Sequence, residues 1–159
     1  MPLISANINA NTWFATCPKG VESLLAVELR NLGAESTRET VAGVHFTGPS
    51  ALAYRACLWS RLANRVLWPL AQLNAADGDS LYRTMKDIDW GRLFQFQKTI
   101  AIDFSGENHA IRNTQFGAQR CKDAIVDRFV ETTGQRPSVD RANPEVRLNS
   151  ETGFVLWFT

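Results

Sequence analysis

The feature that most constrains the fold is an ordered alternation of strand-like and helix-like segments in the first half of the chain. Short apolar or alternating segments predict strands, and apolar residues at helical spacing predict helices. In chain order the pattern predicts a strand at residues 13–17, a helix at 21–32, strands at 35–40 and 44–47, a helix at 51–63 and a strand at 66–73. This β-α-β-β-α-β order is that of the ferredoxin-like fold, with four strands and two helices on one face. The sequence therefore predicts an α+β domain that is complete by residue 73.

Glycine and polar residues mark where the two predicted helices start and stop. Gly33 is expected just after the first helix, where a left-handed backbone favours glycine. Ser50 follows Gly48 and Pro49 and is expected to cap the second helix.

The second half of the chain also mixes helices and strands, in a different order. A turn at residues 77–79 precedes a short helix that runs through Lys86, with Asp79 or Ser80 as its expected cap. The further segments are a half-buried strand at 100–104, a helix at 115–132, short strand candidates at 138–141 and 145–148, and a continuous apolar run at 154–158. The apolar run is typical of a strand buried on both faces. Because such a strand seldom ends a natural chain, we expect this chain to be a fragment of a longer protein.

Length and composition set the class of protein. The chain has 159 residues, of which 45% are hydrophobic and 21% charged, as in one globular domain or two small ones. No apolar run approaches the roughly 18 residues that a membrane-spanning helix needs. Residues 1–12 read as a flexible polar leader without the apolar region of a signal peptide. We therefore expect a cytoplasmic protein.

The cysteines and histidines give no sign of a metal site. Cys17, Cys57 and Cys121 lie far apart, and His45 and His109 are isolated, so no zinc-ligand spacing occurs. We expect the three cysteines to be small buried residues in a reducing compartment.

Catalytic motifs are scarce as well. The sequence contains no G-x-S-x-G, no Walker A motif and no H-E-x-x-H. Residues 143–145 (Asn-Pro-Glu) lack the second proline and the aromatic residue of the Asn-Pro-Pro-aromatic motif of amino-group methyltransferases. No G-x-G-x-x-G follows a predicted strand, so a cofactor cradle is not expected either. The chain by itself is predicted to be non-catalytic.

The best candidate for ligand binding is residues 111–117, which lead into the long second-half helix. Arg112 supplies a cation, Asn113 and Gln115 supply amides, and the N–H groups and dipole of a helix N-terminus attract an anion such as phosphate. Further cations lie on the helix at Arg120 and Lys122 and on loops at Arg136, Arg141 and Arg147, with His109 just before the segment. The formal net charge is only +1, so binding must rely on a local surface. The sequence predicts a nucleic-acid-binding surface here, with a merely solvated helix and loops as the alternative.

A second cationic stretch lies in the first half. Residues 50–76 contain no acid, and their arginines are Arg55, Arg61 and Arg65. Trp59 and Trp68 in this stretch have rings that can stack on bases. Both lie in apolar surroundings, however, which favours places in the core.

Ordered matches along residues 13–158 link the chain to a known family. They are residues 14–22 (FATCPKGVE), 43–46 (GVHF), 58–63 (LWSRLA), 103–106 (DFSG), 111–118 (IRNTQFGA), 122–127 (KDAIVD), Arg136-Pro137 and Val139-Asp140-Arg141. On these stretches the chain resembles the N-terminal region of the bacterial 23S rRNA guanine-N2 methyltransferase family RlmL, often fused as RlmK/L.

The resemblance implies a ferredoxin-like domain at residues 13–73 and an α/β THUMP domain at residues 74–159, or from near residue 43 in a profile-based definition. It implies an RNA-binding module that positions structured RNA, foremost 23S rRNA, for a downstream methyltransferase domain missing from this chain. The methyl donor of such enzymes is S-adenosylmethionine, bound by that downstream domain, so no cofactor is expected in this chain.

Two other functions remain open on the residues alone. A THUMP-bearing tRNA-modifying enzyme is a close alternative within the same class. A protein-interaction domain, whose arginine-rich loops dock a partner or the missing catalytic domain, is the alternative from a different class.

Overall fold

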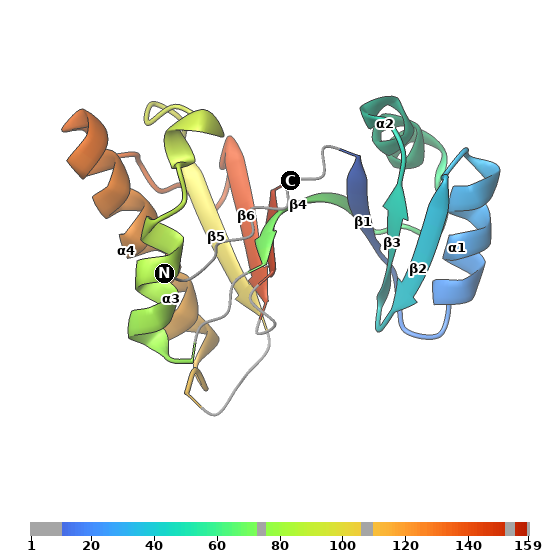
Figure 1. Ribbon diagram of the computed structural model, residues 1–159, viewed down its shortest axis with the longest axis horizontal. Helices are drawn as coiled ribbons and strands as arrows, with labels where there is room; N and C mark the ends of the chain where they lie inside the picture. Colours follow the sequence, from blue (N-terminus) through green and yellow to red (C-terminus); the bar gives the residue numbers. More distant parts are fainter. Residues whose placement is uncertain (1–10, 73–75, 106–109, 152–154, 159) are drawn as a thin grey trace. The chain divides into compact units, whose positions relative to one another are not determined.

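The computed structural model describes residues 11–72, 76–105, 110–151 and 155–158 (Figure 1). Residues 1–10 of the expected leader lie outside this part of the chain. The chain forms two compact units, and the backbone passes from the first to the second between Pro69 and Leu70.

The first unit is the predicted ferredoxin-like domain. Its elements are β1 (Thr12–Thr16), α1 (Glu22–Asn31), β2 (Ser36–Thr40), β3 (Gly43–Thr47), α2 (Ser50–Trp59) and the first part of β4 (Arg65–Gln72), a strand that continues past Pro69 into the second unit. The strands lie in the order β2-β3-β1-β4, and each neighbouring pair is antiparallel. The β-α-β-β-α-β order read from the sequence is therefore confirmed.

One face of this sheet carries the core of the first unit. Side chains alternate between the two faces of a strand, so Ala15 on β1 and its partner Val44 on β3 point to the same side. Both helices pack on that side, because one cluster holds side chains of both strands and of both helices. Its fully buried members are Ala15, Leu25, Ala26, Leu29 and Val44, with Phe46, Leu52 and Ala56 almost fully buried beside them.

The helix boundaries differ from the expectation at two places in α2. Ser50 does not cap the helix; Pro49 holds the N-cap position, and no side chain bonds there. The helix also ends at Trp59, four residues earlier than expected. The cause is a tertiary contact: Glu28 on α1 accepts hydrogen bonds from the Ser60 hydroxyl (2.5 Å) and the Arg61 N–H (2.9 Å). These bonds hold Ser60 in an extended conformation, which stops the helix.

The second unit holds the remaining elements. They are α3 (Gly78–Lys86), the single 3₁₀ turn η1 (Trp90–Arg92), β5 (Ile100–Ser105), α4 (Thr114–Thr133), β6 (Val146–Glu151) and β7 (Val155–Phe158). Strand β6 pairs in parallel with β5 and antiparallel with β7. The expected strand at residues 138–141 is reduced to one bridge between Val139 and Ile100.

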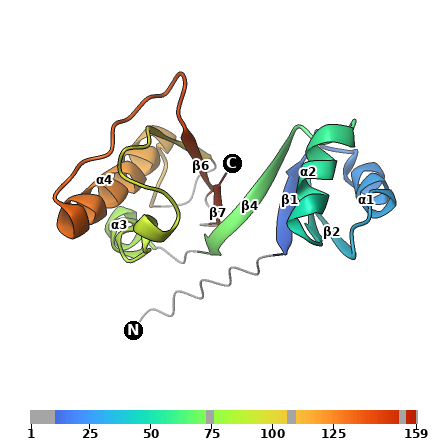
Figure 2. The same cartoon turned by 90° about the horizontal axis from the view of Figure 1, so that it is seen from above.

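Helices α3 and α4 lie side by side (Figure 2), and α4 packs against β5. Leu81, Met85, Ile125 and Phe129 are buried, and Trp90 anchors η1 by donating its indole N–H to the Met85 carbonyl at 2.8 Å. The cap of α3 is Asp77, whose carboxylate accepts the Ser80 N–H at 2.8 Å. The expectation that Asp79 or Ser80 caps α3 is therefore wrong.

Candidate nucleic-acid interface

The segment that the sequence singles out forms the N-terminus of α4. Asn113 is the N-cap: its side-chain oxygen accepts the N–H groups of Gln115 (2.9 Å) and Phe116 (3.4 Å). Two of the N–H groups expected to hold a phosphate are thus bonded within the chain. Cations, rather than the bare helix end, must supply most of the attraction for an anion here.

A shallow groove runs between the first half of α4 and β5. Its walls are Thr114, Gln115 and Ala118 on α4, residues 101–104 on β5, and Arg141 from the loop before β6, around a volume of about 260 Å³. A smaller adjoining hollow is lined by Lys122, Gln119 and Val139, again with Arg141. The fold therefore brings Arg141, from the loop before β6, next to Gln115 and Lys122 of α4.

Arg141 is held in place through its backbone. Arg147 on β6 donates one N–H to the Arg141 carbonyl (3.1 Å) and forms an ion pair with Asp103 on β5 (2.7 Å). The Asp140 carboxylate accepts the N–H groups of Ala142 (2.9 Å) and Asn143 (3.0 Å), which fixes the turn that follows.

These bonds leave the Arg141 guanidinium unoccupied. Its side chain is exposed and has no hydrogen bond or ion pair to any residue that the structure describes. A free guanidinium on an ordered backbone is well suited to bind a phosphate.

Lys122 is less free than Arg141. Its ammonium lies 2.8 Å from the carboxylate of its neighbour Asp123, and its side chain is 23% exposed. It still borders the hollow beside Arg141, so it can add positive charge to this end of the groove.

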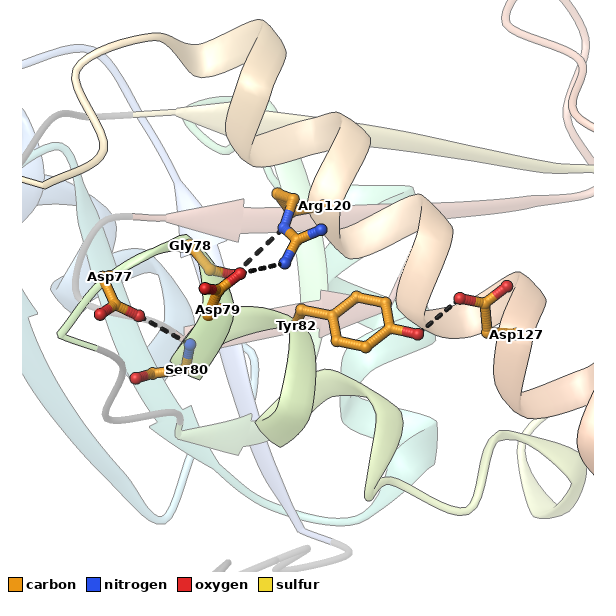
Figure 3. Close-up of polar contacts among 7 residues, drawn as sticks. All are labelled: Asp77, Gly78, Asp79, Ser80, Tyr82, Arg120 and Asp127. Carbon is orange, nitrogen blue, oxygen red and sulfur yellow. Dashed lines mark hydrogen bonds and ion pairs between the residues drawn. The ribbon is translucent and has the colours of Figure 1, made fainter.

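Arg120 points toward α3 (Figure 3), and it is not among the residues that line the groove or the adjoining hollow. Its guanidinium forms an ion pair with Asp79 (2.5 Å), donates to the Gly78 carbonyl (3.3 Å) and lies over the Tyr82 ring at 4.8 Å. The structure thus gives Arg120 a role in joining α3 to α4, which the sequence did not indicate.

Two further contacts complete the junction between these helices. The Tyr82 hydroxyl donates to Asp127 at 2.5 Å (Figure 3). Lys86 pairs with Glu131 at 2.5 Å. The hydrogen bond to Asp127, together with burial and the negative charge of Asp127, raises the pKa of Tyr82.

Arg112 and Arg136 lie at opposite ends of α4. The helix has 20 residues and is about 30 Å long at 1.5 Å per residue. Both side chains are exposed and have no hydrogen bond or ion pair within the described part of the chain. Arg112 precedes the cap at the groove end, whereas Arg136 follows the left-handed Gly134 that ends α4. The seven candidate residues therefore do not form one patch.

Sequence reasoning missed the residues that position the groove. Asp103, Asp140 and Arg147 make the bonds that fix Arg141; of the three, only Arg147 was expected near the site, as a cation rather than as a positioning residue. Asp103 did carry a signal, because it is a charged residue on the polar face of a half-buried strand. Its partner Arg147 is 44 residues away in the chain, so the pair could not be read locally.

The expectation that Trp59 and Trp68 both lie in the core is wrong for Trp59. Trp68 is partly buried and its ring lies 6.3 Å from that of Trp13. Trp59, however, is 69% exposed at the end of α2. By spacing Trp59 shares the helical face of Leu52 and Ala56, but it is the last residue of α2, which ends earlier than the sequence predicts.

The cysteines differ from one another. Cys17 and Cys121 are buried as expected, and burial raises the pKa of the Cys121 thiol to about 12. Cys57 is exposed, so the expectation of three buried cysteines is wrong. Among the residues described, no three histidine, cysteine or acidic side chains come together as metal ligands would. None of the helices described is both long and apolar enough to span a membrane.

Comparisons with known proteins agree with the division of the fold. Residues 12–67 match the family model of the RlmL ferredoxin-like domain, and residues 75–152 match that of the THUMP domain. The ribosomal RNA large subunit methyltransferase K/L of Aeromonas hydrophila is 54% identical over 141 residues, which cover 89% of this chain and 20% of that protein. The K/L enzyme of Methylococcus capsulatus is 53% identical over 137 residues, 86% of this chain and 19% of that protein.

Solved structures share the fold at lower identity. A predicted N6-adenine-specific DNA methylase from Listeria monocytogenes superposes with a TM-score of 0.78 at 21% identity, over 93% of this chain and 40% of that one. This chain spans about a fifth of the length of the curated relatives it matches. An RlmL ferredoxin-like domain followed by a THUMP domain, with half of the residues shared, places the chain in the ribosomal RNA large subunit methyltransferase K/L family.

Proposed function

We propose that this chain is the RNA-binding targeting module of a cytoplasmic, S-adenosylmethionine-dependent methyltransferase that modifies guanine N2 in 23S rRNA. The module holds structured RNA while a separate catalytic domain transfers the methyl group. Support comes from the THUMP domain and from the rRNA methyltransferase names of its relatives. We assign the ferredoxin-like part to residues 13–73 and the RNA-binding THUMP part to residues 74–159.

The observation that carries this proposal is the free guanidinium of Arg141 beside the groove. A phosphate in the groove can accept from Arg141 and lie near Lys122, and the Gln115 amide provides a neutral donor on the opposite wall. Arg112 and Asn113 extend the surface past the N-terminus of α4, and Arg136 adds a contact beyond its C-terminus. Arg120 contributes by keeping α3 against α4.

This arrangement suits a polyanion better than a small molecule. The groove is open and about 260 Å³ in volume, whereas small-molecule sites are usually enclosed pockets of roughly 300–1,000 Å³. Contacts to phosphates position a nucleic acid without reading its sequence. The module is therefore expected to recognise shape and charge.

The direct test is filter binding of the whole chain to a structured 23S rRNA fragment across a salt titration. Arg141→Ala should weaken binding and lower the slope of log K against log salt by about one, as loss of one phosphate contact predicts. Arg92→Ala is the matched control, because Arg92 is an exposed cation on η1 away from the groove. Absence of RNA retention at low salt contradicts the proposal.

The two alternatives are separated in the same assay. If a tRNA displaces the rRNA fragment at a lower concentration than the rRNA fragment itself does, the result favours a function in a tRNA-modifying enzyme. Retention of neither RNA, with capture of a separately produced methyltransferase domain, favours the protein-docking function.

A further inference from the structure

Helix α2 presents three large side chains to solvent. Leu58 is 78% exposed, Tyr54 is 72% exposed and Trp59 is 69% exposed. Residues four apart are neighbours on a helix surface, so Tyr54 adjoins Leu58 and Arg55 adjoins Trp59. We call these four residues the α2 face. Leu52, Ala53 and Ala56 of the same helix pack in the core, and Trp59, three residues after Ala56, lies at the edge of the α2 face nearest to them.

Folding of the first unit does not account for this face. Neither Tyr54 nor Trp59 makes a ring contact or hydrogen bond with another residue in the described part of the chain. Large apolar groups gathered on one surface are typical of interaction sites. Tryptophan and tyrosine supply rigid, flat rings for such contacts.

The charge around the α2 face is positive. Arg55, Arg61 and Arg65 are exposed, and residues 50–76 contain no acid. An acid from another element, Glu28 on α1, does reach the end of this helix. Its two carboxylate oxygens accept hydrogen bonds from Ser60 and Arg61. Arg55 is itself anchored by a 2.7 Å hydrogen bond to the Leu32 carbonyl at the end of α1.

Flat exposed rings among ordered arginines match the chemistry of unpaired nucleotides. Bases stack on aromatic rings with little regard to sequence, and arginines meet the phosphates between them. We propose that the α2 face is a stacking platform for unpaired nucleotides of the RNA bound by this chain, with Trp59 and Tyr54 under the bases. This inference rests on the proposed function and adds a second, non-groove contact to it. Carboxylates beside the rings would repel the phosphates of RNA, whereas a protein partner would not require acids to be absent from residues 50–76.

Two RNAs and three variants test the platform. The RNAs are one structured fragment with an unpaired tail and the same fragment without it. Stacking of one base is worth about 1–3 kcal/mol, so Trp59→Ala should weaken binding of the tailed RNA about 5-fold or more and leave the blunt RNA unchanged. Trp59→Phe should restore most of the loss because a ring remains. Trp59→Leu should not, because it keeps apolar surface without a flat ring.

Leu24→Ala is the matched control, since Leu24 is an exposed apolar residue on α1 at 58% exposure. It should bind both RNAs like the unchanged protein. Equal binding of the tailed RNA by Trp59→Leu and the unchanged protein overturns the platform. If the unchanged protein binds neither RNA, the proposed function itself fails, which is a distinct result.

Cys57 supplies a second readout that needs no substitution. It is exposed on α2 next to Leu58, whereas Cys17 and Cys121 are buried. Tailed RNA should slow alkylation of Cys57, measured by mass spectrometry, and blunt RNA should not. Equal alkylation rates with bound tailed RNA and with no RNA contradict the platform.

Discussion

The guanidinium of Arg147 on β6 lies 2.7 Å from the carboxylate of Asp103 on the adjacent parallel strand β5. Through its other terminal nitrogen Arg147 donates to the Arg141 carbonyl at 3.1 Å. One side chain thus links two strands to the loop that carries the free cation of the groove. Under the proposed function, Asp103, which also lines the groove, affects RNA binding through this link to Arg141.

Asp103→Asn should therefore weaken RNA binding without much loss of stability. The pair is partly exposed, so removing its charge should lower the free energy of unfolding by less than about 1 kcal/mol. The substitution weakens the hold of Arg147 on β5 and so its support of the Arg141 carbonyl, and binding should fall by up to about tenfold, the loss of one charged hydrogen bond. Filter binding and urea unfolding measure the two effects.

A double-mutant cycle separates positioning from a direct contact. In the Arg141→Ala background, Asp103→Asn should cause no further loss of RNA affinity, because the group that it positions is already gone. Fully additive losses would show that Asp103 or Arg147 affects RNA by another route.

Tyr82 provides a pH-dependent test of the junction between α3 and α4. Its hydrogen bond to Asp127 raises the pKa of the phenol in the folded state. The stabilisation is therefore complete below the ordinary tyrosine pKa of about 10 and is lost as pH rises through the higher folded value. Tyr82→Phe should lower the free energy of unfolding by about 1 kcal/mol at pH 7.

The difference between Tyr82→Phe and the unchanged protein should vanish, or reverse, in strongly alkaline solution. Urea unfolding from pH 7 to 11 measures it. If the difference in free energy of unfolding between the two proteins stays constant over this pH range, the hydrogen bond to Asp127 gives no pH-dependent stabilisation.

Much of the fold follows from local signals, whereas the site does not. The order of strands and helices in the first unit is readable because each segment has its own period and its own breaker, such as Gly33 with its φ of +112°. The early end of α2 depends on Glu28, which is 32 residues before Ser60 in the chain. Arg120 likewise meets Asp79 across 41 residues. Residue type therefore predicted where cations occur, and only the tertiary partners decide which of them remain free.

Substitutions at two positions with left-handed backbone should change the free energy of unfolding in opposite directions. Ala42 has a φ of +59° and Gly134 a φ of +70°, and a side chain at Gly134 would meet nothing within 4 Å. A left-handed conformation costs an L-residue about 1–2 kcal/mol, partly offset by the greater chain entropy of glycine in the unfolded state. Ala42→Gly should raise the free energy of unfolding by about 0.5–1 kcal/mol, and Gly134→Ala should lower it by about 1 kcal/mol. Urea unfolding of both variants is the measurement, and changes of the same sign would contradict the backbone explanation.

The close approach of α4 to β5 depends on Gly117. A methyl group at this position would lie 2.6–2.8 Å from the ring of Phe104, which is closer than a carbon–carbon contact allows. Gly117→Ala should therefore lower the free energy of unfolding by about 1–3 kcal/mol, as overpacking of a core does. Because the same helix turn carries Gln115 and Ala118 of the groove, RNA affinity should fall as well.

The matched double variant identifies the clash as the cause. Phe104→Leu removes the ring, so Gly117→Ala should cost less in that background than alone, giving a favourable coupling energy. Thermal and urea unfolding of the four proteins in the cycle measure this coupling. If Gly117→Ala costs the same with and without the Phe104 ring, the close packing of α4 on β5 is not what requires glycine there.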